Sequence, residues 1–370
     1  MPCTKPIDNL ILKRKTNISN YLVNFFPKTL AKLISDYDYQ FHGKSFTLIK
    51  SSLSTCNSLY HTKFFSHDGS VRCIVTLTDD RIISGSQDGI IKIWNLKNEG
   101  YEIDSIIGHN DWIICMAVFY DTIKSEYHLV TGSRDATLQV WKIGETIEYE
   151  FTLVAHTDSV LCIAVLPDDG QYPKIISGSC DSTLKIWTID LINRCGKCDI
   201  TLEGHTHHVT CVAVLPNPND GCSRRIVSGS LSDELKIWTF KNNNVCVKNF
   251  PVYYENDLPS LSVMRCITVF SDEIIITGAD DHNLKMWNIN TEMCVDKIDE
   301  GHSTSVVCSI VLPDGHLLTG SGRTLRIWNM KTQKCDIVLP AHADWIRCVA
   351  SLSDGRIVSG SKDGTIKIWC

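Results

Sequence analysis

Apolar residues along this chain gather in short runs that are rich in β-branched side chains and are separated by turn residues. One such unit contains runs at 71–77, 81–84 and 90–94, with Asp88 and Gly89 in the turn before the third run. β-Branched residues favour strands, and Asp followed by Gly supplies the geometry of a tight hairpin. The pattern therefore predicts an all-β chain of short antiparallel strands.

The same unit recurs seven times, and each copy carries a Ser/Thr-Gly-Ser/Ala tripeptide that precedes a tryptophan by a nearly fixed interval. Successive tryptophans lie between 41 residues (Trp287 to Trp328) and 51 residues (Trp187 to Trp238) apart. That length holds four short strands with their turns, which is the size of one propeller blade. Seven copies therefore predict a seven-bladed β-propeller. The seven tripeptides begin at Ser84, Thr131, Ser177, Ser228, Thr277, Thr319 and Ser359.

From about residue 58 to the end, this pattern closely resembles the WD-repeat family. The resemblance implies a buried hydrogen-bonded chain in each blade, which links a His before the inner strand, a Ser or Thr, the turn Asp and the Trp. Such a chain gives each buried polar atom a partner and so specifies the geometry of the blade. The four complete sets are His67, Ser84, Asp88 and Trp94; His109, Thr131, Asp135 and Trp141; His156, Ser177, Asp181 and Trp187; and His342, Ser359, Asp363 and Trp369.

The remaining three copies depart from the family pattern. The fourth copy has Ser232 at the Asp position, the fifth lacks the His, and the sixth is one residue short, with Gly322 in the turn. No tryptophan is followed by the Asp that gives the family its name. We therefore expect blades four to six to be less tightly fixed than the others.

Recurring His, Ser and Asp residues also invite a catalytic or metal-binding interpretation. Their repetition argues against that interpretation, because residues that recur once in every repeat are typical of a structural role. A propeller enzyme, the less favoured alternative, would need an unrepeated cluster of acids, bases or metal ligands in the channel. The sequence offers none, so we expect no enzymatic activity, no cofactor and no metal.

The chain ends one residue after Trp369, so the seventh copy lacks an outer strand of its own. An unpaired sheet edge invites aggregation. Residues 59–65 lie just before His67, and Phe64 stands where later copies have a leucine before their own histidines. We therefore predict that residues 59–65 pair with the last blade and close a propeller domain that spans residues 58–370.

Residues 1–57 lie outside the repeat. Pro27 suits a first helical turn, and Leu30, Leu33, Ile34 and Tyr37 have the apolar spacing of a helix. We predict a short amphipathic helix in a mainly helical N-terminal extension.

Part of this extension resembles an F-box, at residues 25–34 and again at residues 53–60. Combined with a WD-repeat propeller, the resemblance implies a substrate receptor of a cullin-type ubiquitin ligase that binds a Skp-type adaptor through residues 18–57. Phe26 stands where an F-box usually has its leading Leu. Two alternatives remain open: a helical cap on the propeller rim, and a coiled-coil strand as in G-protein β subunits, although no heptad persists.

Binding residues of a propeller are expected on exposed loops that a rigid scaffold positions. The residue that opens the inner strand is Trp112 in blade two and Trp345 in blade seven, whereas the other copies have small or polar residues there. Exposed tryptophans are common binding anchors. The residue before each inner-strand Cys is an arginine in three blades, namely Arg72, Arg265 and Arg347.

The residue before the turn Asp also varies, with Arg134 in blade two, Lys362 in blade seven and Asp280 in blade five. Ring closure makes blades seven, one and two neighbours. We therefore expect one cationic sector on the rim face, where an acidic or phosphorylated peptide could make bidentate Arg contacts. The alternative is that these cations have no ligand and only form ion pairs with nearby acidic groups of the protein. The predicted sector contains Arg72, Trp112, Arg134, Trp345, Arg347 and Lys362.

Residues 72–73 and 133–138 also resemble the phosphodegron-reading strands of F-box WD-repeat receptors. The resemblance implies that the ligand is a phosphorylated protein segment.

Composition narrows the choice of partner. The formal net charge of −6 argues against general nucleic-acid binding, which favours a basic face. No apolar run is long enough for a signal peptide or a membrane span. We therefore expect a soluble protein of the cytoplasm or the nucleus, as a monomer or part of a hetero-complex, with no membrane partner.

The 17 cysteines are an odd number in a chain without a secretory signal, so a disulfide framework is not expected. Cys195 and Cys198 form a Cys-x-x-Cys pair, but no second pair or matching histidine spacing accompanies it, so we expect no zinc site. Seven others occupy one equivalent place in apolar runs, and we expect them to be small buried hydrophobes. These seven are Cys73, Cys115, Cys162, Cys211, Cys266, Cys308 and Cys348.

Overall fold

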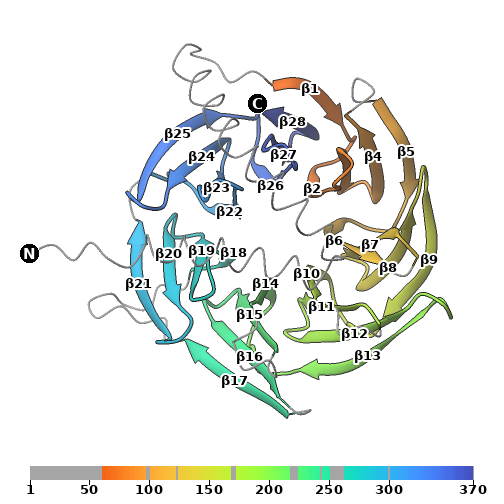
Figure 1. The fold of residues 1–370 in the computed structure, drawn as a ribbon, viewed down its shortest axis with the longest axis horizontal. Coiled ribbons are helices and arrows are strands. Elements are labelled where there is room, and N and C mark those ends of the chain that lie inside the picture. Colours follow the sequence, from red (N-terminus) through yellow and green to blue (C-terminus); the bar gives the residue numbers. More distant parts are fainter. Residues whose placement is uncertain are drawn as a thin grey trace, which may run out of the picture.

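The computed structural model describes residues 61–96, 101–121, 124–167, 172–216, 224–241, 244–250, 262–298 and 301–369. These residues form seven four-stranded antiparallel sheets, which are arranged around a common centre like the blades of a propeller (Figure 1). The predicted fold class, an all-β seven-bladed propeller, is confirmed. The predicted helical extension over residues 1–57 lies outside the described residues.

In blades one to six the strands pair in chain order from the inner strand to the outer strand. Blade one consists of β2 (Val71–Thr76), β3 (Arg81–Ser86), β4 (Ile90–Asn95) and β5 (Tyr101–Ile107), and blade two of β6 (Ile113–Asp121), β7 (Glu126–Ser133), β8 (Thr137–Ile143) and β9 (Ile147–Val154). Blade three has β10 (Val160–Leu166), β11 (Lys174–Ser179), β12 (Leu184–Asp190) and β13 (Cys195–Leu202), and blade four β14 (Val209–Leu215), β15 (Arg224–Ser230), β16 (Leu235–Lys241) and β17 (Asn244–Phe250). Blade five has β18 (Met264–Val269), β19 (Ile274–Ala279), β20 (Leu284–Asn288) and β21 (Met293–Ile298), and blade six β22 (Val306–Val311), β23 (Leu317–Ser321), β24 (Thr324–Asn329) and β25 (Lys334–Pro340).

Blade seven is built from both ends of the described chain. Its inner strands are β26 (Ile346–Ser351), β27 (Ile357–Ser361) and β28 (Thr365–Trp369), and its outer strand is β1 (His61–Ser66). Residues Phe64 and Phe65 of β1 lie opposite Lys367 and Ile366 of β28. Backbone hydrogen bonds between the first and last strands therefore close the ring.

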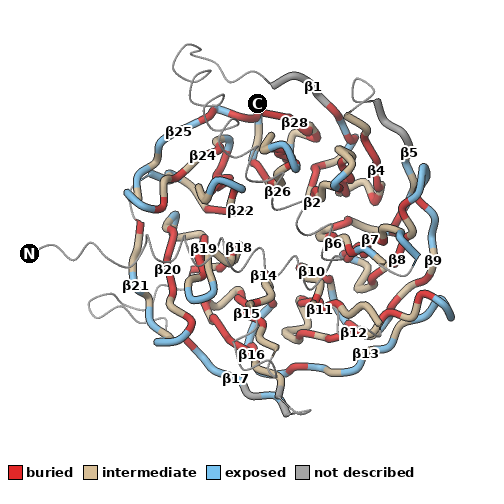
Figure 2. The backbone as a smooth tube through the Cα atoms, viewed as in Figure 1, coloured by how far each residue is buried: buried red, intermediate tan, exposed pale blue. Residues whose placement is uncertain are grey.

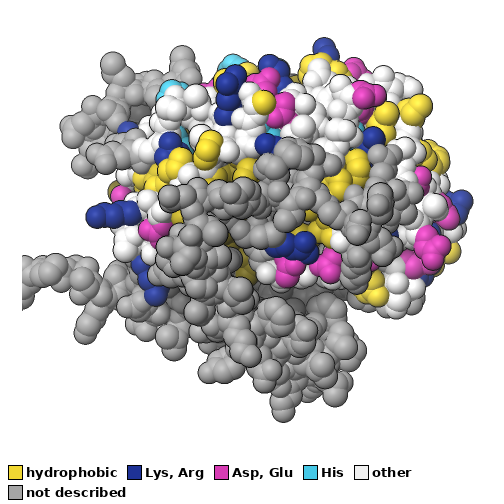
Figure 3. Space-filling model, turned by 90° about the horizontal axis from the view of Figure 1, so that it is seen from above, with side chains coloured by type: hydrophobic (Ala, Val, Ile, Leu, Met, Phe, Trp, Pro, Cys, Tyr) yellow, Lys and Arg dark blue, Asp and Glu magenta, His cyan; other side chains and the backbone are white. Residues whose placement is uncertain are grey.

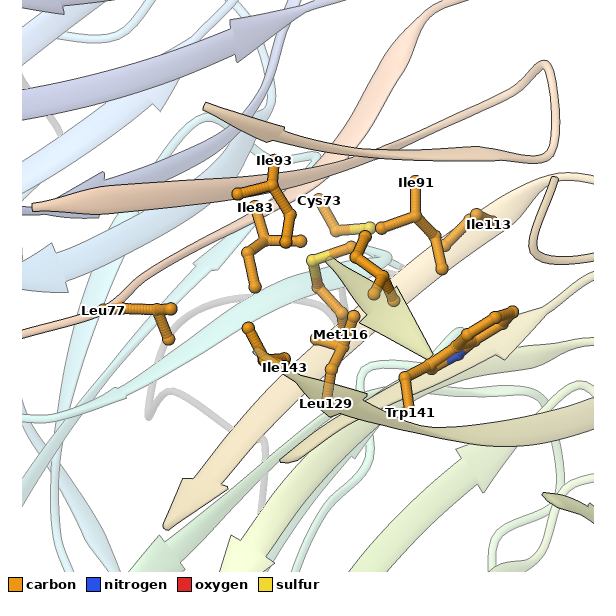
Figure 4. Close-up of a cluster of buried hydrophobic side chains, with 11 residues drawn as sticks. Cys73, Leu77, Ile83, Ile91, Ile93, Ile113, Met116, Leu129, Trp141 and Ile143 are labelled. Carbon is orange, nitrogen blue, oxygen red and sulfur yellow. The ribbon is translucent and has the colours of Figure 1, made fainter. Parts of the chain in front are cut away.

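Apolar cores lie between neighbouring blades rather than at the centre of the disc. The cluster shown in Figure 4 combines Ile83 and Ile91 of blade one with Ile113, Leu129 and Trp141 of blade two. Six further clusters join the other neighbouring pairs, including blades seven and one. Exposed residues follow the outer strands (Figure 2). Each blade is thus half of two cores and cannot bury its faces alone.

The glycine of each tripeptide lies where the next blade packs against the backbone. A Cβ atom on Gly360 of blade seven would lie 2.7 Å from Cys348 Sγ of its own blade and 2.7 Å from Val71 Cγ1 of blade one. Real Cβ atoms essentially never approach so closely. The same arrangement of own-blade cysteine and next-blade inner-strand residue occurs at Gly85, Gly132, Gly178, Gly229, Gly278 and Gly320.

The seven repeated cysteines therefore pack beside these glycines. Five of them are buried, while Cys115 and Cys308 are partly buried. Burial raises the pKa of all seven thiols, for example to about 12 for Cys73 and Cys211. The thiols are accordingly neutral, inert space-filling groups, as the sequence predicted.

We predict that Gly178→Ala destabilises the fold by about 1–3 kcal/mol, because the new methyl group would overlap Cys162 and Val209. Urea unfolding measures the change. Gly144→Ala is the matched control, because its Cβ would approach no atom closer than 3.7 Å. Equal unfolding midpoints for the two variants would contradict the packing argument.

Candidate functional site

The four complete His, Ser/Thr, Asp and Trp sets form hydrogen-bonded chains inside their blades. In blade three, His156 Nδ1 lies 2.7 Å from Asp181 Oδ2, and His156 Nε2 lies 2.8 Å from Ser177 Oγ. Trp187 Nε1 donates a hydrogen bond of 2.8 Å to the same Ser177 Oγ. Burial lowers the pKa of His156, so its ring is neutral. A carboxylate can only accept, so Nδ1 carries the proton and Nε2 accepts from the serine hydroxyl.

Blades one, two and seven repeat this arrangement. His109 Nδ1 lies 3.0 Å from Asp135 Oδ2, and Trp141 Nε1 donates to Thr131 Oγ1 at 3.0 Å. In blades one and seven the His Nδ1 to Asp Oδ2 distance is 3.4 Å. In blade seven His342 Nδ1 also lies 3.0 Å from Thr365 Oγ1, whereas in blade one His67 Nδ1 and Asp88 Oδ2 have no hydrogen-bond partner among the described residues. The corresponding Ser-to-Trp bonds are Ser84 with Trp94 and Ser359 with Trp369.

In blade four another residue takes the place of the missing Asp. His205 Nδ1 lies 3.1 Å from Glu234 Oε2, and its Nε2 lies 2.7 Å from Ser228 Oγ. Glu234 stands two positions after Ser232 in the turn, and its longer side chain reaches the ring. Aligning the copies residue by residue does not reveal that Glu234 replaces the Asp, because only the folded turn brings Glu234 and His205 together.

Blade five replaces the missing histidine differently. The side chain of Lys285 is only 2% exposed, and its Nζ lies 2.9 Å from Asp281 Oδ2 of the turn and 3.6 Å from Asp233 Oδ2 of blade four. Burial raises the pKa of Asp233 to about 6, although Lys285 acts in the opposite direction. A buried ammonium thus links blades four and five. In blade six His302 lies 3.2 Å from Thr319, and the described residues provide it with no carboxylate partner.

The arginines that precede an inner-strand Cys occupy an irregular backbone position. Arg72, Arg265 and Arg347 each fall where the pairing of the inner strand with the second strand shifts register. Such a bulge turns a side chain out of the regular alternation. Inner strands surround the centre of the disc (Figure 1), so these residues belong to one ring around the channel. The equivalent residues of the other blades are Ile114, Leu161, Thr210 and Val307.

Arginines and tryptophans stack together in blades one, two and seven. The Cζ atoms of Arg72 and Arg134 lie 5.6 Å and 4.6 Å from the ring centre of Trp112. Arg347 Cζ lies 5.7 Å from the ring of Trp345, which is 39% exposed. We call these five residues the arginine face. On the rim in Figure 3, basic and acidic side chains lie side by side among exposed apolar ones.

Nearby acids of the described residues offset the charges of Arg72 and Arg347 only in part, since Asp344 raises the pKa of Arg347. Burial, and then the positive charge of Arg347, lower the pKa of Arg72. Burial and the charge of Arg265 lower the pKa of Arg347. Neither Arg72 nor Arg347 forms an ion pair with a described residue, and the buried Arg347 Nε and Ser70 Oγ have no hydrogen-bond partner there. Buried donors without partners cost free energy, which an anionic ligand would recover.

The other cations are partly neutralised. Arg134 Nε lies 3.9 Å from Asp111 and Lys362 Nζ lies 3.7 Å from Asp344, and both cations are about half exposed. Lys362 therefore lies beside an acid, as Arg134 does. Arg265, which the sequence argument left out because blade five does not adjoin blades seven, one and two, lies close enough to influence the charge of Arg347. The sequence did contain a signal for Arg265, because it precedes Cys266 as Arg72 and Arg347 precede their own inner-strand cysteines.

Within the part of the chain that the structure describes, no group of three or more His, Cys, Asp or Glu side chains could hold a metal ion. Cys195 is exposed and Cys198 is partly buried, and both are free thiols. No described residue belongs to a helix with the length and apolar character that crossing a membrane requires.

A family model described as WD domain, G-beta repeat, matches residues 57–95, 100–142, 147–188, 196–239, 293–329 and 333–370. The matches omit most of blade five, the blade without the histidine. DENN domain and WD repeat-containing protein SCD1 of Arabidopsis thaliana is 32% identical over 111 residues, which cover 29% of this chain and 9% of that protein. Nuclear distribution protein PAC1 of Arthroderma otae is 28% identical over 230 residues, which cover 54% of this chain and 47% of that protein.

These alignments thus span less than half of either relative. Among solved structures, the crystal structure of the WD40 beta propeller domain of Doa1 superimposes with a TM-score of 0.67 at 25% identity. The superposition covers 84% of this chain and 96% of that domain.

We predict that Lys285→Met destabilises the protein by about 3–5 kcal/mol, because Asp233 and Asp281 would be left buried without their cation. Lys185→Met is the matched control at the equivalent position of blade three, where the ammonium only contacts the hydroxyl of Thr201. Denaturant unfolding of both variants tests the prediction. Similar losses in both would show that the buried ammonium has no special role.

Stability should fall as the pH drops from about 6.5 towards 4. Burial lowers the pKa of His205 and His342 to about 4, whereas an unfolded histidine titrates near 6.5. The unfolded chain therefore binds protons first on acidification, at a cost of about 1.4 kcal/mol per pH unit for each such histidine. The pKa of His109, His156 and His302 is also lowered.

Asp233 has the opposite sign, because its folded pKa of about 6 lies above its unfolded value of 3.8. It therefore adds stability as the pH falls through that window. Asp233→Asn should make the acid-induced loss steeper. Urea midpoints measured between pH 7 and pH 4.5 check both statements, and a midpoint that stays constant over this range would refute the first.

Proposed function

Because this chain belongs to the WD domain, G-beta repeat family, we propose that it is a platform for protein partners that binds an acidic or phosphorylated peptide on its arginine face. The observation that carries the proposal is the pair of partly buried arginines, Arg72 and Arg347, which lack ion-pair partners among the described residues. Isolated cations at a rigid channel mouth suit a ligand that brings its own negative charge.

The surrounding side chains favour a peptide over a simple ion. Trp345 is exposed and adjoins Arg347, so an apolar ligand residue could pack on its indole while an acidic one reaches the guanidinium. Trp112 holds Arg72 and Arg134 in place by stacking. The competing interpretation, internal neutralisation, accounts for Lys362 and in part for Arg134 and Arg347, but not for Arg72.

A ubiquitin-ligase receptor is a narrower form of the same proposal. Its support is the F-box-like segment around Phe26 and Pro27, which lies outside the described residues. The full chain should then recover a Skp-type adaptor and a cullin from cell extract, whereas residues 58–370 should not. Equal recovery, or none, would favour a plain scaffold whose N-terminal segment caps the propeller. We place the protein in the cytoplasm or the nucleus.

We predict that Arg72→Glu combined with Arg134→Glu lowers the affinity for a phosphorylated peptide more than tenfold, about 2 kcal/mol or more. Two new carboxylates would repel the ligand where two guanidiniums attracted it. Fluorescence anisotropy with a phosphopeptide selected from a library measures the change.

The control reverses two charges on outer strands, Lys197→Glu and Lys334→Glu, both of which are exposed. Thermal melting should be unchanged in both double variants. Retained binding by the Arg72 and Arg134 variant would remove this site.

A further inference from the structure

The channel ring distributes its charges unevenly. Of the seven bulge residues, the three arginines come from blades five, seven and one, with Val307 of blade six between the first two, while blades two and three contribute Ile114 and Leu161. A ligand at the channel mouth therefore meets most of the cations on one side and aliphatic side chains alone on blades two and three.

Arg265 differs from the other two arginines in having a carboxylate partner of its own. Its Nε donates to Asp280 Oδ1 at 2.8 Å, and its Nη2 donates to Asp280 Oδ2 at 2.7 Å. The geometry is bidentate, the form in which arginine binds carboxylates and phosphates most strongly. By contrast, Arg134 and Lys362 each have a single, longer contact with an acid. Arg134 Nε lies 3.9 Å from Asp111 Oδ2, and Lys362 Nζ lies 3.7 Å from Asp344 Oδ2.

Asp280 stands where blades two and seven have a cation. It precedes the turn residue Asp281, at the position that Arg134 and Lys362 hold in their own blades. At this position blade five therefore has a negative charge, like that of an anionic ligand, where blades two and seven have a positive charge that would attract one. The pair is partly exposed, with 41% of the Arg265 side chain and 29% of the Asp280 side chain accessible, so solvent and competing anions can reach it.

We infer that Asp280 is an internal competitor for Arg265, so that the arginine face has one open anion subsite at Arg72 and Arg347 and a second that a ligand opens only by displacing Asp280. The inference rests on the proposed function. The second subsite engages a ligand that carries two neighbouring anionic groups, and it contributes nothing to a ligand with one. Asp280 thereby determines how strongly the face distinguishes the two ligands.

Electrostatics supports a single continuous site. Arg265 lowers the pKa of Arg347 and, less strongly, that of Arg72, after the effect of burial on both. The hydrogen bonds from Arg265 lower the pKa of Asp280, which keeps its carboxylate ionised at neutral pH. The three arginines hold the same bulge position on blades five, seven and one, which places both subsites on one ring, and Asp280 competes as a full negative charge.

The test compares two synthetic peptides of the same neutral sequence, one with a single phosphoserine and one with two neighbouring phosphoserines. Fluorescence anisotropy with the full chain gives both affinities and their ratio. Asp280→Asn should raise the affinity for the doubly phosphorylated peptide about threefold to fivefold, the strength of a partly exposed ion pair. The affinity for the singly phosphorylated peptide should stay within about twofold.

Two further variants separate the competition from general charge effects. Asp344→Asn removes an equal charge beside Lys362 and should leave the affinity ratio unchanged. Arg265→Gln removes the second subsite and should bring the ratio close to one, a result that does not depend on how Asp280→Asn folds.

An unchanged ratio in Asp280→Asn, with both peptides still bound, would overturn the inference and leave the proposed function standing. A ratio unchanged in Arg265→Gln would overturn it as well. If neither peptide binds the unaltered protein, or if Arg72→Glu with Arg134→Glu binds both normally, the proposed function itself fails.

Discussion

Each blade of this propeller packs its inner strand directly onto the backbone of the blade before it, and the rest of the structure depends on that contact. The glycine of every Ser/Thr-Gly-Ser/Ala tripeptide makes it possible, because a side chain there would overlap a cysteine of the same blade and an inner-strand residue of the next. Gly360 and Val71 make this contact between the last blade and the first. With β1 paired to β28, the ring closes by packing at its centre and by backbone hydrogen bonds at its edge.

Close packing at the centre leaves polar groups buried within each blade, and these groups must satisfy one another. In blade three burial keeps the histidine neutral, and the chain runs from the tryptophan through a hydroxyl and the imidazole to a carboxylate. The buried groups need a partner of the right charge, and that partner can stand at different positions of the repeat. Glu234 provides the carboxylate in blade four, and Lys285 provides a buried cation in blade five, where it joins two blades. Weak repeats in the sequence therefore need not be weak blades.

The proposed function rests on a position of the repeat whose residue varies. Each inner strand has one bulge residue, and its identity can vary because the backbone contacts beside it do not change. In this WD-repeat protein, that freedom places Arg72 and Arg347 on adjacent blades beside two tryptophans. Asp280 binds the third arginine, and we propose that it thereby limits what the ring can bind. The scaffold and the recognition surface are thus separable within one repeat.

The sequence by itself determined the blade count, the all-β class and the burial of the repeated cysteines, because each depends on a pattern repeated seven times and one copy supports the next. It also identified Arg72, Arg134 and Trp112 as candidates for one surface, since blade order is readable from chain order. Only the tertiary structure decided how Glu234 and Lys285 fill the gaps, and that Arg265 belongs to the ring although its blade is distant in order. The physical reason is that charges and long side chains act across space, and their partners are set by the closed ring, not by position in the repeat.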